Sequence, residues 1–111
     1  MNTYVILRRN GWKSTEELQE AADRSRAVGD EQMSNDIRAV RFYVLNEDDG
    51  SVGSLCIYQA SSPEAIREHA FRADLPLDEI IPVADTVVVR PDPESAEVQA
   101  SIGAPGDLRH F

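Results

Sequence analysis

The sequence predicts an α+β fold of the ferredoxin-like type, in the order strand, helix, strand, strand, helix, strand. Two segments with helical periodicity each begin with a Ser-x-x-Glu capping signal, and short β-branched runs flank them. The dipeptide Asp49-Gly50 is a strong hairpin signal between the two middle strands. Together these observations predict a four-stranded antiparallel sheet that carries both helices on one face.

The first half of the chain supplies one strand and one helix. The run TYVILR at residues 3–8 is short, β-branched and aromatic, which is typical of a strand. After an Asn-Gly turn, Ser14 and Glu17 form a capping box, and apolar residues then recur at helical spacing as far as Gly29. We therefore expect the first helix at about residues 14–29.

The second half begins with the central hairpin, with strands expected at residues 37–46 and 52–60. The second helix is expected over residues 61–73, opened by Ser61 and Glu64. On this helix one face carries Ile66, His69, Ala70 and Ala73. A valine-rich run predicts the last strand at about residues 84–90.

Length and composition predict one domain at residues 1–90, followed by a proline-rich tail at residues 91–111 that is flexible or ordered by a partner subunit. The net charge of −9 argues against nucleic acid and against an anionic membrane surface as partners. A single cysteine excludes an intrachain disulfide. With no signal-peptide pattern and no long apolar run, we expect a soluble cytoplasmic protein.

The register of the hairpin decides which side chains share a face. If Asp49-Gly50 forms a two-residue loop, Tyr43 lies opposite Cys56 and Arg41 lies opposite Tyr58. These four side chains would then occupy the face without helices, as a ligand-binding or dimer surface. The apolar residues Val40, Phe42, Val44, Leu55 and Ile57 would pack beneath the helices.

His69 and Cys56 are the candidate metal ligands, and His69 is the better candidate because imidazole is the commonest metal ligand and a natural proton carrier. Each also has a purely structural interpretation, as a hydrogen-bonded core histidine and a small buried cysteine. In the two-residue register His69 points toward the sheet, whereas Cys56 points away from the helices. A loop one residue longer would turn Cys56 toward the helices.

Several motifs resemble a small bacterial ferredoxin-like family, a domain of unknown function whose characterised member is a nickel-binding protein. The resemblance covers about residues 3–90. Its motifs are Arg41-Phe42-Tyr43, the acidic hairpin, Cys56-x-Tyr58-x-Ala60, the Arg-Glu-His-Ala run at residues 67–70, Leu75-Pro76 and Val83. The resemblance implies a ferredoxin-like homodimer, with nickel or another divalent metal near His69 or Cys56.

The first functional hypothesis is therefore a small dimeric metal-binding or ligand-binding protein, not an enzyme, assembled as a dimeric α/β barrel or by stacking two sheets. An alternative is a cofactor-independent monooxygenase or an isomerase or cyclase of the dimeric barrel type. In that case His69 would be the acid–base group, and Arg41, Tyr43 and Tyr58 would hold the substrate. A further alternative is an interaction module without a small ligand.

Overall fold

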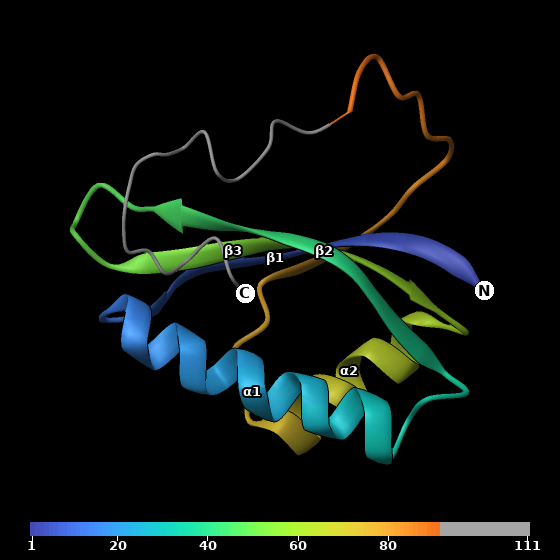
Figure 1. Ribbon diagram of the computed structural model, residues 1–111, viewed down its shortest axis with the longest axis horizontal. Helices are drawn as coiled ribbons and strands as arrows, with labels where there is room; N and C mark the ends of the chain where they lie inside the picture. Colours follow the sequence, from blue (N-terminus) through green and yellow to red (C-terminus); the bar gives the residue numbers. More distant parts are fainter. Residues whose placement is uncertain (92–111) are drawn as a thin grey trace.

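The structure is a computed structural model that describes residues 1–91, and it has the predicted ferredoxin-like order. The elements are β1 (Asn2–Trp12), α1 (Thr15–Glu31), β2 (Ile37–Asn46), β3 (Val52–Ala60), α2 (Pro63–Ala73) and β4 (Glu79–Pro82). The strands form one antiparallel sheet in the order β2-β3-β1-β4, and both helices lie on one side of it (Figure 1). The predicted tail lies outside the described residues from residue 92 onward.

Both helices begin at serine caps, one of them a residue later than predicted. The Ser14 hydroxyl accepts a hydrogen bond from the Glu17 backbone N–H at the start of α1, as the capping box predicts. In α2 the cap is Ser62 instead of Ser61, because Pro63 occupies the first helical turn and the cap must precede it. Neither helix is long and apolar enough to cross a membrane.

The hairpin between β2 and β3 does not have the predicted two-residue loop. Glu47 and Ser51 close the turn, since the Glu47 N–H donates to the Ser51 carbonyl and the Gly50 N–H donates to the Glu47 carbonyl. Gly50 has a φ of 88°, a left-handed conformation that glycine adopts without steric cost. The loop is therefore three residues long, with its glycine at the last position, which is the next commonest hairpin type.

This extra residue shifts the register by one and turns β3 over. Phe42 lies opposite Cys56, and Tyr43 lies opposite Leu55. Cys56 and Tyr58 consequently face the helices and are buried, which corrects their predicted position on the uncovered face. The prediction that Leu55 and Ile57 pack beneath the helices is wrong for the same reason.

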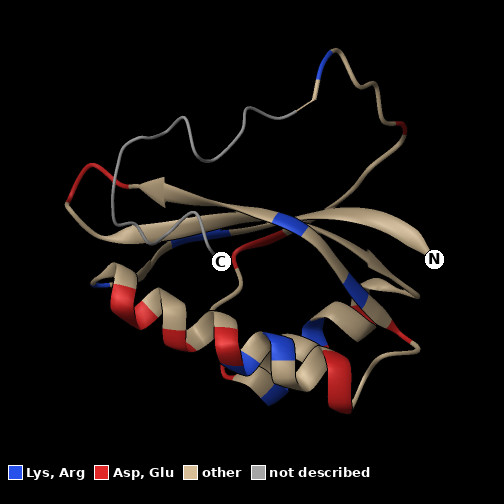
Figure 2. Cartoon of the chain, viewed as in Figure 1, with Lys and Arg blue, Asp and Glu red and all other residues tan. Residues whose placement is uncertain are grey.

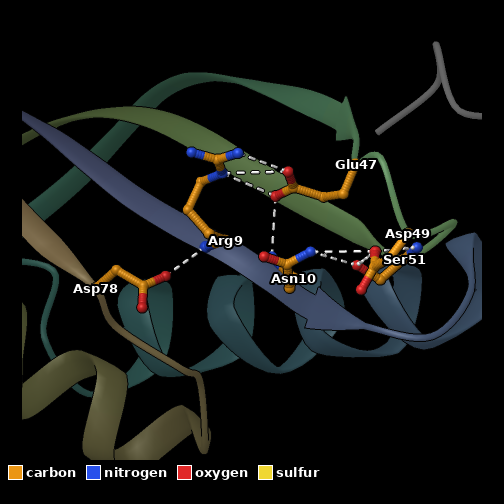
Figure 3. Close-up of polar contacts among 6 residues, drawn as sticks. All are labelled: Arg9, Asn10, Glu47, Asp49, Ser51 and Asp78. Atoms are coloured by element: carbon orange, nitrogen blue, oxygen red, sulfur yellow. Dashed lines mark hydrogen bonds and ion pairs between the residues drawn. The ribbon is translucent and has the colours of Figure 1, made fainter.

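A polar cluster holds the hairpin tip against β1 (Figure 3). The Glu47 carboxylate accepts hydrogen bonds from the Arg9 guanidinium, at 2.8 Å from Nη2, and from the Asn10 backbone N–H at 2.9 Å. Asn10 also donates to Ser51 Oγ, and the Arg9 backbone N–H donates to Asp78 in the loop before β4. The cluster therefore joins the turn, the end of β1 and the approach to β4.

The last strand lies at Glu79–Pro82 and not at the predicted residues 84–90. In the antiparallel register Tyr4 lies opposite Pro82 and Leu7 lies opposite Glu79. A continued register would place residue 84 opposite Asn2, where β1 begins. The valine run therefore lies past the end of its partner strand, and Val87, Val88 and Val89 are exposed.

Replacement of Glu47 by glutamine should lower the free energy of unfolding at pH 7. The hydrogen bonds from Arg9 and from the Asn10 N–H lower the pKa of Glu47. Folding therefore favours the carboxylate, and this stabilisation is present above the ordinary value of 4.5 and is lost as the pH falls through the folded-state pKa. Urea unfolding across the pH range measures the effect.

In that experiment the difference between wild type and Glu47→Gln should shrink as the pH falls through the lowered folded-state pKa of Glu47. Asp48→Asn is the matched control, because it removes an exposed carboxylate from the same turn. An equal loss of stability in the two variants would contradict a specific role for Glu47.

Candidate functional site

A cavity of about 340 Å³ lies between α1 and the helix-facing side of the sheet. Side chains from β1, α1, β2, β3 and α2 line it, so that distant parts of the sequence meet there. Its apolar walls include Trp12, Leu18, Phe42 and Leu75. Its buried polar side chains are Arg8, Ser54, Cys56, Tyr58 and His69. A mainly apolar cavity with a few converging polar groups is the usual form of a ligand site.

His69 reaches the cavity from the buried face of α2, and only 1% of the residue is exposed. Its Nε2 lies 3.0 Å from the Ser25 carbonyl oxygen, which can only accept, so Nε2 carries the proton. Burial lowers the pKa of His69 and favours the neutral imidazole. Nδ1 is then an unprotonated acceptor, and it is buried without a hydrogen-bond partner.

Tyr58 packs against His69, with the ring centroids 5.7 Å apart and the planes at 72°. Its hydroxyl lies 3.1 Å from Ser25 Oγ, which connects it to the same turn of α1 that holds His69. Burial raises the pKa of Tyr58, so the phenol stays protonated. The pair forms one wall of the cavity.

Cys56 is buried beside Arg8, whose Nη1 lies 3.4 Å from the sulfur. Burial raises the pKa of the Cys56 thiol, although the positive charge of Arg8 opposes this effect. The protonated thiol is therefore the favoured form at neutral pH. In this form Cys56 is a weak acceptor and not a reactive nucleophile.

Arg8 is the residue of the site that the sequence analysis missed. It lies on β1 and is 2% exposed, and it is the only buried residue with a permanent charge among residues 1–91. A signal for it was present, since Tyr4, Ile6 and Arg8 alternate along one strand and must share a face. A strict period of two would have placed Arg8 beneath the helices.

The structure brings Cys56, Tyr58 and His69 together but separates them from Arg41 and Tyr43. These two lie on the face of the sheet without helices, where Tyr43 is 46% exposed and its hydroxyl lies 3.4 Å from Arg41 Nη1. The predicted grouping of Arg41, Tyr43 and Tyr58 in one site is therefore wrong. The cause is the longer turn, which moved Tyr58 to the other face.

The residues present do not complete a metal site. Among residues 1–91 no group of three or more His, Cys, Asp or Glu side chains could hold a metal ion. His69 and Cys56 do line the same cavity, but a protein metal site usually needs at least three ligands. The guanidinium of Arg8, in contact with Cys56, further opposes a divalent cation at that sulfur.

Charge is distributed unevenly among the helices and strands (Figure 2). Acidic residues lie along α1 and at the hairpin tip, whereas basic segments lie along β1 and β2. The exposed side chains that line the cavity include two basic ones, Arg26 and Arg38, and one acidic one, Asp30. Arg26 also lies 3.9 Å from the Asp23 carboxylate in an exposed ion pair, which partly compensates its charge.

The sequence matches the model of a known protein family. The family is described as "Nickel responsive protein SCO4226-like", and its sequence model matches residues 4–83. The matched range contains Arg8, Cys56, Tyr58 and His69, together with all four strands and both helices in whole or in most part. No curated protein and no solved structure matches the chain.

Proposed function

Because this chain belongs to the SCO4226-like family of nickel responsive proteins, we propose that it is a small binding protein whose ligand occupies the cavity between α1 and the sheet. The family predicted from the sequence motifs is thus confirmed. The observation that carries the proposal is a pair of buried polar atoms, Arg8 Nη2 and His69 Nδ1, that have no hydrogen-bond partner.

Buried polar groups in folded proteins are nearly always paired, since an unpaired group costs on the order of 1–3 kcal/mol. Here one unpaired donor and one unpaired acceptor belong to residues that line a single cavity. A bound ligand with both kinds of polar atom would satisfy them, while Trp12, Leu18 and Phe42 would cover its apolar part.

Filling the cavity should abolish uptake of a small apolar probe. Ala22 lines the cavity, whereas Ala27 is exposed on the same helix and does not. Benzyl alcohol should shift the NMR signals of cavity residues in wild type and in Ala27→Phe, but not in Ala22→Phe. Probe-induced shifts in Ala22→Phe as large as those in wild type would contradict the proposed site.

Nickel is the metal that the family description names, and the sequence analysis predicted His69 and Cys56 as its donors. Both belong to the cavity, and Nδ1 of His69 has a free lone pair. Nickel accepts imidazole and thiolate ligands, but these two residues need further donors and a deprotonated thiol. A partner subunit on the uncovered face would be separated from them by the sheet itself.

A nickel titration followed by calorimetry tests this donor pair. Because two donors beside Arg8 do not make a complete site, we expect wild type, His69→Ala and Cys56→Ser to give the same binding isotherm. Loss of binding in both variants would instead establish the metal site that the sequence predicted. Ser54→Ala changes another cavity-lining side chain, two positions before Cys56 on β3, and is the control for altered packing.

We also propose that the protein is a homodimer that associates through the uncovered sheet face. No helix or strand of residues 1–91 covers this face. Its side chains include Leu55 and Ile57, which lie opposite Tyr43 and Arg41 on β2. An apolar strip bordered by an aromatic and an arginine resembles the composition of protein interfaces.

Light scattering during gel filtration tests the dimer. Leu55→Glu places a charge in the middle of the uncovered face and should convert the dimer to a monomer. Phe71→Glu is the matched control, because Phe71 is 82% exposed on α2 and lies away from that face, so this variant should remain dimeric. A monomeric wild type at tens of micromolar would contradict the proposal.

Catalysis is the second candidate function, and one observation favours it. The cavity holds His69 together with Tyr58, as an acid–base site would require. Nδ1 could accept a proton, since the neutral tautomer leaves it unprotonated. Recovery of a cavity ligand in chemically altered form would support this function, whereas recovery of the unchanged ligand supports simple binding.

A further inference from the structure

The buried charge of Arg8 indicates what kind of ligand the cavity takes, given the binding function proposed above. Arg8 lies on β1 opposite Ser54, and only 2% of the residue is exposed to solvent. Removal of a guanidinium from water is costly unless an anion compensates its charge. The groups in contact with Arg8 therefore decide whether its charge is compensated within the protein.

None of these neighbours carries a negative charge. Arg8 Nε donates to the Pro76 carbonyl oxygen at 2.7 Å, and Nη1 lies 3.4 Å from the Cys56 sulfur. Nη2 has no partner, and no ion pair joins Arg8 to a carboxylate among residues 1–91. A carbonyl and a protonated thiol accept hydrogen bonds but leave the positive charge uncompensated.

An uncharged amide or hydroxyl could donate a hydrogen bond to the Pro76 carbonyl oxygen equally well. That hydrogen bond alone therefore does not explain why a positively charged side chain is buried at this position. Asp30 is the carboxylate among the cavity-lining residues, but it is exposed and does not pair with Arg8. The charge is thus available to an anion that enters the cavity.

We propose that the cavity binds a small organic monoanion, with its carboxylate on Arg8 and its apolar body against Trp12, Leu18 and Phe42. Nη2 of Arg8 is the charged donor without a partner, and a carboxylate is a strong acceptor for a guanidinium N–H. A phosphate dianion would need several more donors than this mainly apolar cavity offers. His69 Nδ1 and the Ser54 hydroxyl remain for a polar substituent on the ligand.

The positions of Arg26 and Arg38 at the cavity are consistent with an anionic ligand. Both line the cavity from its exposed side, on α1 and β2 respectively. Arg38 places positive charge at the exposed side of the cavity, whereas the charge of Arg26 is partly compensated by Asp23, 3.9 Å away. This second observation is independent of Arg8.

The test compares two probes of the same shape, benzoate and benzyl alcohol, on the full-length protein by NMR or calorimetric titration. Wild type should bind benzoate at least about tenfold more tightly, as expected for one charge-assisted hydrogen bond. Arg8→Met should lose this preference and still bind benzyl alcohol. Arg41→Met, on the opposite face of the sheet, should keep the preference of wild type.

Each other outcome is decisive. Equal binding of the two probes to wild type would overturn the anion site and leave the cavity proposal standing. Binding of neither probe would overturn the binding cavity itself, and the anion site with it. A benzoate preference that survives in Arg8→Met would also overturn the assignment, because Arg8 would not be its source.

A second variant covers the possibility that Arg8→Met does not fold. Arg8→Lys keeps the charge but loses the planar fork, so it should weaken benzoate binding and leave benzyl alcohol binding unchanged. A merely structural Arg8 would instead alter the affinity for both probes together. Displacement of benzoate by chloride at equal concentration would reduce the site to one for inorganic anions and overturn the organic-acid proposal.

Discussion

The three-residue turn at residues 48–50 decides which face of the sheet each side chain of β3 occupies. Side chains alternate along a strand, so one added loop residue moves the whole set to the opposite face. In this chain the turn places Cys56 and Tyr58 under the helices with His69, and it leaves Leu55 and Ile57 outside. The contents of both the cavity and the uncovered face follow from this local choice.

The fold was predictable because its signals are local. Capping serines, β-branched runs and the hairpin glycine each act within a few residues, and together they indicate the order of elements. The site was less predictable because it depends on register and burial. Asp49-Gly50 fits both a two-residue and a three-residue loop. The longer loop is held by the Glu47 carboxylate, which accepts a hydrogen bond from the backbone N–H of Asn10, 37 positions away in the sequence.

Arg8 illustrates a different limit. Arginine is rarely buried, and an analysis based on composition therefore assigns it to the surface. Strand alternation placed it beside Ile6 on the inner face, and the tertiary structure followed the alternation. The valine run after Pro82 shows the converse, since a strong β-propensity did not produce a strand where β1 offered no partner.

β2 and β4 are the outer strands of the sheet, and each has a feature that disfavours pairing with another strand. The register of β2 is interrupted between Ala39 and Arg41, and Arg38 and Arg41 are exposed along it. β4 has four residues and ends at Pro82, which lacks an N–H. Such edges resist the addition of a further strand, which is the usual route by which sheets grow into fibrils.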